Sequence, residues 1–104
     1  MKRWVAVAKT GEVQPGRPKV TQVDALRVAV FQLQDGELRA IEDVCTHDDG
    51  PLAEGRVEGE VIECPRHGAR FDLKTGEVLC MPAITPVRSF PVRVNGSQIE
   101  IECE

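Results

Sequence analysis

The sequence predicts an all-β fold of antiparallel sheets in a single domain, residues 1–104. Aromatic residues make up only 4% of the chain and tyrosine is absent, so the core must come from aliphatic side chains, with a strong bias to the β-branched residues that favour strands. Asp35-Gly36 and Asn95-Gly96 each lie between two β-rich runs, which is typical of hairpin turns. A chain of 104 residues is long enough for one modest core.

The N-terminal half predicts four strands. Large and small residues alternate from Trp4 onward, and we expect the Trp4 indole to anchor the core. Glycine and proline then mark a turn-rich loop from Gly11 to Pro18. The four strands are expected at residues 4–8, 19–23, 26–33 and 38–44.

The C-terminal half predicts shorter strands and a final hairpin. Glu58-Gly59-Glu60 is expected to turn the chain into a strand at 60–63. A tight turn is expected from Asp72 to Gly76, in which Asp72 and Thr75 bond to the local backbone. Residues 80–83 should be extended because Pro82 disfavours a helix there. Residues 87–94 and 98–102, which flank Asn95-Gly96, should form the last hairpin.

Two short motifs carry the chemistry, Cys45-Thr46-His47 and Cys64-Pro65-Arg66-His67, and they contain both histidines of the chain. Each motif offers one thiolate and one imidazole at a spacing typical of metal ligands. Gly50-Pro51 follows the first motif and Gly68 follows the second, so tight loops are expected at both. The strands that precede the motifs would fix the position of each cysteine.

The order of the ligands favours an iron–sulfur cluster over zinc. A zinc finger with two cysteines and two histidines usually keeps the two residue types apart and its histidines on a helix, whereas here they alternate. A plant-type cluster needs a closely spaced cysteine triplet, but Cys45, Cys64, Cys80 and Cys103 lie far apart. A cluster with two thiolates on one iron and two imidazoles on the other fits the residues present.

Together with Gly68, Phe71-Asp72 and Thr75-Gly76, the two motifs resemble the Rieske family, whose members bind one 2Fe-2S cluster. The resemblance implies a Rieske fold, with a cluster-binding subdomain at about residues 44–83 inserted in a β base. It implies that Cys45 and Cys64 hold an inner iron, and that His47 and His67 hold an outer iron at one exposed tip. It also assigns Pro82 to a loop that covers the cluster.

The resemblance is closest to the small Rieske ferredoxins of ring-hydroxylating oxygenase systems. It implies a one-electron carrier, itself not an enzyme, between an NAD(P)H-dependent flavoprotein reductase and a terminal non-haem iron oxygenase. Docking would be transient and would use the His47/His67 tip. The alternatives are the small subunit of an assimilatory nitrite reductase and a zinc-stabilised interaction module.

Three positions set the chain apart from the respiratory branch of the family. That branch places a disulfide between the cluster loops, where this chain has Gly50 and Arg66, so no covalent link is expected. It also places a serine hydroxyl near the cluster, where this chain has Ala69. Fewer hydroxyl donors imply a reduction potential in the lower part of the Rieske range.

The net charge of −4 argues against nucleic acid or an acidic membrane as a partner. The apolar run near the N-terminus ends at Lys9, which is too short for a signal peptide or a membrane span. These observations predict a cytoplasmic protein. In that reducing compartment, Cys80 and Cys103 are expected to be free thiols.

Overall fold

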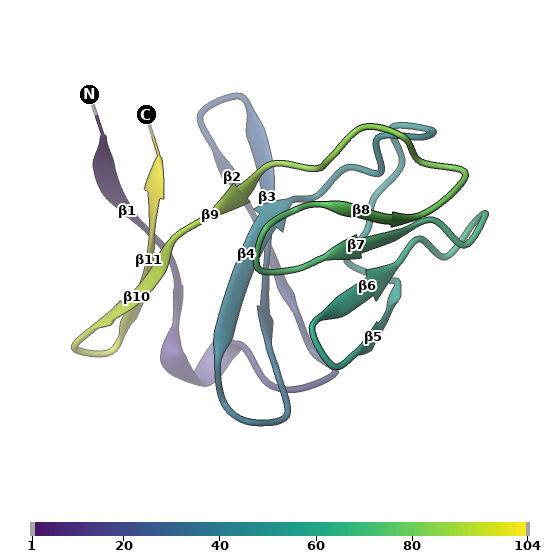
Figure 1. Ribbon diagram of the computed structural model, residues 1–104. Helices are drawn as coiled ribbons and strands as arrows, with labels where there is room; N and C mark the ends of the chain where they lie inside the picture. Colours follow the sequence, from purple (N-terminus) through teal and green to yellow (C-terminus); the bar gives the residue numbers. More distant parts are fainter. Residues whose placement is uncertain (1, 104) are drawn as a thin grey trace.

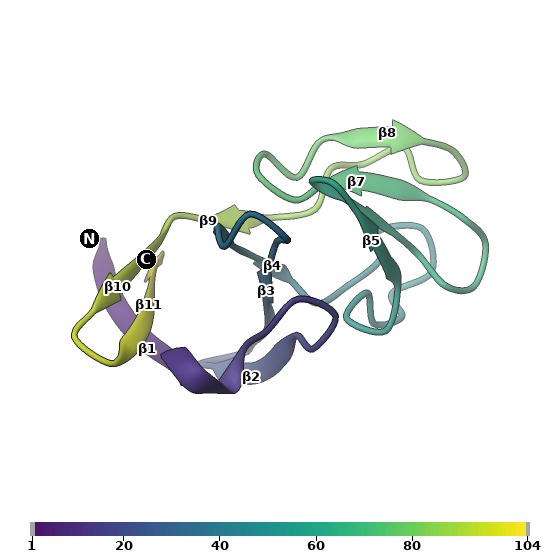
Figure 2. The same cartoon turned by 90° about the horizontal axis from the view of Figure 1, so that it is seen from below.

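The computed structural model describes residues 2–103, which form antiparallel β-sheets as predicted. The strands are β1 (Arg3–Lys9), β2 (Lys19–Val23), β3 (Leu26–Gln32), β4 (Leu38–Glu42), β5 (Arg56–Glu58), β6 (Val61–Glu63), β7 (Arg70–Asp72), β8 (Val78–Cys80), β9 (Ser89–Phe90), β10 (Val92–Asn95) and β11 (Gln98–Cys103). They form three sheets with the orders β1-β11-β10, β2-β3-β4-β9 and β5-β6-β7-β8. Figures 1 and 2 show the second sheet between the other two.

The middle sheet is covered on both faces, because alternate residues of a strand point to opposite sides. One face packs toward the β5–β8 sheet, and its buried side chains there are Ala29, Phe31 and Ile41, with Leu33 directly after β3. The other face packs against the first sheet, and its buried side chains are Val23, Val28, Val30, Ala40 and Phe90. The β3–β4 hairpin therefore connects the two cores of the molecule.

Both predicted hairpins are confirmed. At the β3–β4 turn, the Gly36 N–H donates to the Leu33 carbonyl over 2.9 Å, and the Leu33 N–H donates to the Glu37 carbonyl over 2.8 Å. At the β10–β11 turn, Asn95 pairs with Gln98, so the two residues of the loop are Gly96 and Ser97. The hairpin position was right, and the two-residue turn itself lies one residue later than the Asn-Gly dipeptide.

The predicted strand at 87–94 is wrong as a single element. Pro91 divides it into β9, which pairs with β4 in the middle sheet, and β10, which pairs with β11 in the first sheet. Proline has no N–H for a sheet ladder, so the chain leaves one sheet and joins the next at this residue. The Pro91 carbonyl still accepts a 3.0 Å hydrogen bond from the Glu102 N–H.

The β5–β8 sheet contains three strands that the sequence did not predict, β5, β7 and β8. Each has three residues, which is too few for an alternating pattern to be visible. The predicted turn between β7 and β8 is confirmed, because the Asp72 carboxylate accepts hydrogen bonds from the N–H groups of Lys74 and Thr75 over 2.8 and 3.0 Å. This turn connects β7 to β8, which pair as antiparallel strands.

Two expectations for the N-terminal region also change. Val5 and Val7 face the core, so alternation places Trp4 on the outer side of β1 instead of in the core. There the Arg93 guanidinium lies 4.2 Å from the centre of the half-buried indole ring. The expected loop at Gly11–Pro18 is preceded and partly replaced by one helical turn, η1 (Thr10–Glu12). Within residues 2–103, no helix is long and apolar enough to cross a membrane.

Candidate metal centre

Two short loops carry the four predicted ligands. The first follows β4, and the second connects β6 to β7. In the first loop, the Cys45 N–H donates to the Gly50 carbonyl over 2.7 Å, and in the second, the Cys64 N–H donates to the Ala69 carbonyl over 2.7 Å. Gly68 has a φ of 79°, a left-handed conformation that favours glycine. Each cysteine thus begins a tight turn, as predicted.

The structure brings the four residues together as an inner and an outer pair. Cys45 and Cys64 are buried, with 0% and 1% of their surface exposed. His47 and His67 are exposed, and their ring centres lie 5.1 Å apart with an interplanar angle of 84°. The thiols therefore face the core, and the imidazoles face the solvent.

An acidic side chain, Asp48, lies between the two pairs. One of its oxygens is within 4.8 Å of both cysteine sulfurs, and an Asp48 oxygen is also within 4.8 Å of ring nitrogens of both histidines. The Asp48 oxygens already accept hydrogen bonds from the Arg66 guanidinium and the Gly50 N–H. The donors that remain for a metal centre are therefore the two thiols and the two imidazoles.

This donor set fits a cluster in which one iron takes two thiolates and the other takes two imidazoles. Burial raises the pKa of the Cys45 thiol, and the neighbouring Cys64 also raises it. The Cys45 thiol should therefore keep its proton until a metal displaces it, since the thiolate is the ligand form. Binding of the metal centre would release protons and would give the buried sulfurs a bonding partner in the apolar core.

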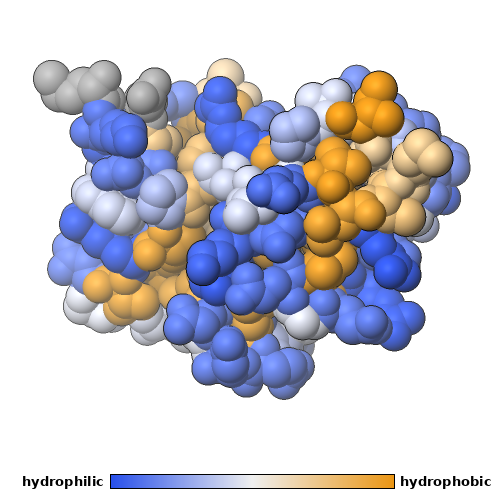
Figure 3. All heavy atoms as spheres, viewed as in Figure 1, coloured by the Kyte–Doolittle hydropathy of each residue, from blue (hydrophilic) through white to orange (hydrophobic). Residues whose placement is uncertain are grey.

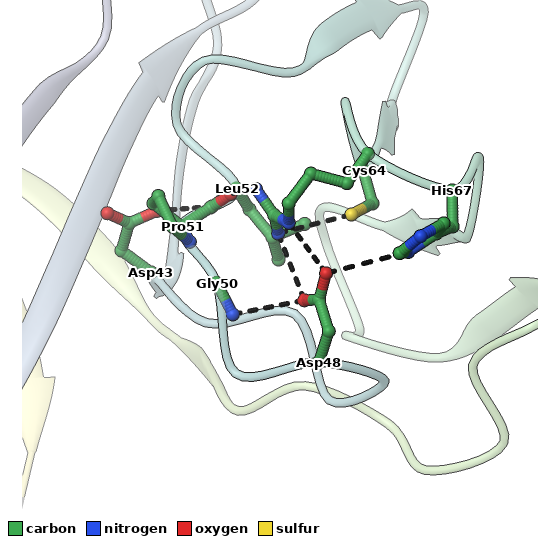
Figure 4. Close-up of polar contacts among 8 residues, drawn as sticks. Asp43, Asp48, Gly50, Pro51, Leu52, Cys64 and His67 are labelled. Carbon is green, nitrogen blue, oxygen red and sulfur yellow. Dashed lines mark hydrogen bonds and ion pairs between the residues drawn. The ribbon is translucent and has the colours of Figure 1, made fainter.

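The Asp48–Arg66 pair joins the two ligand loops and was not anticipated from the sequence. The Arg66 Nε and Nη2 atoms lie 2.6 and 3.1 Å from the two Asp48 oxygens. Figure 4 shows the Asp48 carboxylate between Gly50 and His67, with Cys64 beside them. The Arg66 guanidinium, with the Gly50 N–H, holds the pKa of the Asp48 carboxyl well below its usual range.

Asp43, which the sequence analysis did not single out, anchors the first loop. Its side chain is fully buried, and Oδ1 accepts hydrogen bonds from the Leu52 and Ala53 N–H groups over 2.7 and 2.8 Å. Its Oδ2 lies 3.0 Å from Arg27 Nη2. Two residues before Cys45, the carboxylate therefore fixes both ends of the loop that carries Cys45 and His47.

The segment after β8 runs beside the first loop. The Thr46 hydroxyl donates to the Thr85 carbonyl, which links the first ligand motif to this segment. Pro82 is exposed and follows a cis peptide bond, whereas Ala83 is buried in the same core as Cys45 and Cys64. The role of Pro82 as a cover for the cluster remains a prediction.

The remaining cysteines lie apart from the four-residue set. Cys80 ends β8 and is exposed, and Cys103 ends β11 and is buried in the other core. Both have free thiols in the structure.

Comparisons with known proteins identify a family and similar folds. The family model of the Rieske [2Fe-2S] domain matches residues 3–91. The ferredoxin component of a naphthalene 1,2-dioxygenase system from Pseudomonas aeruginosa is 31% identical over 100 residues, which cover 96% of this chain and 95% of that protein.

Two solved structures share the fold. A chain from the complex of reduced oxygenase and oxidized ferredoxin in carbazole 1,9a-dioxygenase has a TM-score of 0.84 and 35% identity, covering 94% of this chain and 91% of that one. A chain assigned as the small subunit of an NADH-dependent nitrite reductase from Mycobacterium tuberculosis has a TM-score of 0.88, covering 100% of this chain and 97% of that one. At 23% identity, the second likeness concerns the fold alone.

Proposed function

The chain belongs to the Rieske [2Fe-2S] domain family, and on that premise we propose that it carries single electrons from an NAD(P)H-dependent flavoprotein reductase to a terminal non-haem iron oxygenase. The relatives are ferredoxin components of such systems, so the chain is an electron-transfer component and not the catalytic enzyme. The observation that carries the proposal is the pair of exposed imidazoles directly outside two buried thiols. Family membership also confirms the predicted fold and the prediction of one 2Fe-2S cluster.

We assign Cys45 and Cys64 to the inner iron and His47 and His67 to the outer iron. The burial of the two thiols and the exposure of the two imidazoles support this order. When bound, the cluster accepts and releases one electron, and its neutral imidazoles leave it less negative than an all-thiolate cluster, which favours reduction. The chain's own contribution is to fix both ligand loops and to leave the histidine side accessible to a partner.

The assignment is tested on the purified protein by its metal and sulfide content. We expect two iron atoms and two acid-labile sulfides per chain. The cluster should be reduced by NADH through the reductase of a naphthalene or carbazole dioxygenase system, and reoxidised by the matching oxygenase. One zinc ion per chain in place of iron would support the interaction-module alternative instead. A cluster that is reduced but never reoxidised by an oxygenase would contradict the proposed acceptor.

We propose that partners dock at the tip around the two histidines. The polar and proline side chains of this tip are Asp48, Asp49, Pro51, Arg66 and Pro82. Beside them, three large hydrophobic residues of β8 and the following loop are exposed, namely Leu79 (51%), Met81 (76%) and Ile84 (85%). Figure 3 shows hydrophobic side chains gathered on the face over β8. An apolar patch next to the electron exit suits a short-lived contact with the oxygenase component.

The docking proposal is tested by Met81→Gln and Ile84→Gln. Both side chains are largely exposed, so the substitutions should leave the melting temperature and the reduction potential unchanged. We expect the second-order rate of electron transfer to the oxygenase to fall at least fivefold. Val94→Gln is the matched control, because Val94 is 53% exposed but lies on β10, in another sheet. Wild-type rates of electron transfer in all three variants would place the contact surface elsewhere.

A nitrite reductase subunit is the weaker alternative, because no observation beyond the shared fold favours it. We further propose a cytoplasmic location, because the reductase draws on NAD(P)H and the four thiols are unpaired. The net charge of −4 supports protein partners rather than nucleic acid.

A further inference from the structure

Arg66 reaches from the second ligand loop across to the first. Its Nε and Nη2 bind the two oxygens of Asp48, and its Nη1 donates to the Pro51 carbonyl over 3.0 Å. One side chain thus makes three hydrogen bonds to the opposite loop. A bidentate guanidinium–carboxylate pair fixes direction as well as distance, unlike a single surface contact.

The first loop is shaped to receive this guanidinium. A Cβ atom at Gly50 would lie 2.4 Å from Arg66 Cζ and 2.6 Å from its Nη2, so any larger residue would displace the group. The Gly50 N–H also donates to Asp48 Oδ1 over 3.0 Å, which holds the carboxylate toward Arg66. The side chains of Arg66 and Asp48 are 33% and 21% exposed, so solvent competes with the pair only in part.

The same guanidinium contacts an assigned cluster ligand. Arg66 Nη2 lies 3.2 Å from Cys64 Sγ. A positively charged donor at a ligand sulfur stabilises the electron-rich state more than the electron-poor state, and hydrogen bonds to the sulfurs are one means by which a protein raises a cluster's potential. We propose that Arg66 is a positioning residue that clasps the two ligand loops together and, through Cys64 Sγ, raises the reduction potential of the cluster. The inference rests on the proposed function.

The proposal is tested with Arg66→Met, Arg66→Lys and Gly50→Ala, each purified with its cluster. The readouts are the lifetime of the cluster absorbance in excess chelator and the potential by protein-film voltammetry. For Arg66→Met we expect cluster loss at least fivefold faster. We also expect an equilibrium constant for reduction at least threefold lower, which is about 30 mV at 59 mV per tenfold change. Arg66→Lys keeps the charge but cannot form the bidentate pair with Asp48. The lifetime of its cluster should therefore shorten, while its reduction potential should change less than that of Arg66→Met.

Arg70→Met is the matched control. Arg70 Nε lies 3.0 Å from the Glu63 carboxylate on the neighbouring strand, an arginine–carboxylate ion pair with a single contact and no contact to a ligand sulfur. We expect wild-type lifetime and potential for this variant. If Arg66→Met cannot be isolated with a cluster while Arg70→Met can, the clasp is supported, and Gly50→Ala, which keeps Arg66 but displaces its guanidinium, supplies the potential measurement.

Each of two results would overturn the inference: an unchanged cluster lifetime in Arg66→Met, or unchanged potentials in both Arg66→Met and Gly50→Ala. Either result with a normal wild-type cluster removes the role of Arg66 and leaves the electron-carrier function standing. A wild-type protein without iron and sulfide would instead remove the proposed function itself.

Discussion

Replacing Asp43 with alanine should destabilise the protein through two backbone groups of the first ligand loop. The N–H groups of Leu52 and Ala53 would lose the carboxylate oxygen that accepts both of them. Leaving a buried donor unsatisfied costs about 1–3 kcal/mol. Leu52 is fully buried and Ala53 only partly so, and we expect a total loss of about 3 kcal/mol in the free energy of unfolding. At about 4 °C per kcal/mol for a chain of this size, the melting temperature should fall by roughly 12 °C.

Asp43→Asn distinguishes the contribution of the loop hydrogen bonds to stability from the contribution of the negative charge. An asparagine keeps an acceptor at Oδ1 and loses only the ion pair with Arg27, whose side chain is 56% exposed. Such a pair contributes about 1 kcal/mol or less, so Asp43→Asn should melt within about 4 °C of the wild type. Circular dichroism melts of the three cluster-loaded proteins provide the comparison. Equal melting temperatures for the alanine and asparagine variants would refute the account, because the loop N–H groups would then not matter.

Four further predictions concern single residues. Gly76→Ala should lower the free energy of unfolding, measured by chemical denaturation, by about 2–3 kcal/mol, because the new Cβ would lie 1.9 Å from the Val87 carbonyl oxygen at a φ of 81°. Gly16→Ala is the control and should lower it less, because Gly16 has a φ of 80° but open space around it. His67→Cys should lower the potential if the cluster survives, because an anionic ligand replaces a neutral one, and an unchanged voltammogram would remove His67 from the ligand set. The wild-type potential should lie below zero, in the lower part of the range of about −150 to +300 mV, and Ala69→Ser should raise it by adding a donor; a positive wild-type value would contradict this expectation. The pKa of Asp48 is lowered in the folded protein, so this carboxylate should stabilise the fold fully above its unfolded pKa of about 3.9 and lose that contribution as the pH falls further. The difference in melting temperature between wild type and Asp48→Asn should therefore be constant above about pH 5 and should shrink in acid. A difference that stays constant into acid would exclude this linkage between pH and stability.

The features that the sequence predicted correctly are those that depend on residues adjacent in the chain. The turns at Asp35-Gly36 and at Asp72–Gly76, and the loops after Cys45 and Cys64, depend on local backbone preferences, so their positions were right. The division at Pro91 was also readable, since a proline inside a strand pattern argues against a central strand. The alternation of Val92 and Val94 with polar residues concealed it, and the strand was predicted as continuous from residue 87 to 94.

The contacts that organise the centre depend on tertiary structure and could not be predicted in this way. Asp48 and Arg66 are eighteen residues apart, and the geometry of two separate loops decides whether they meet. One signal did exist. The two positions at which the respiratory branch has its disulfide read Gly50 and Arg66, a small and a large residue, and in the structure the guanidinium lies where a Gly50 side chain would be. Asp43 offered no comparable signal, because an acidic residue at a strand end is ordinary.

The middle sheet, covered on both faces, has a consequence for how the molecule opens. Amides of β3 can exchange with solvent only when the packing in both neighbouring cores is disrupted. The β5–β8 sheet and its loops contact only one of these cores, so they can open when that core alone is disrupted. Hydrogen exchange should therefore be slowest in β3 and β4 and faster around Cys45 and Cys64. The cluster end can open locally while the base keeps its fold, which gives iron and sulfide a route to the buried thiols without unfolding of the whole chain.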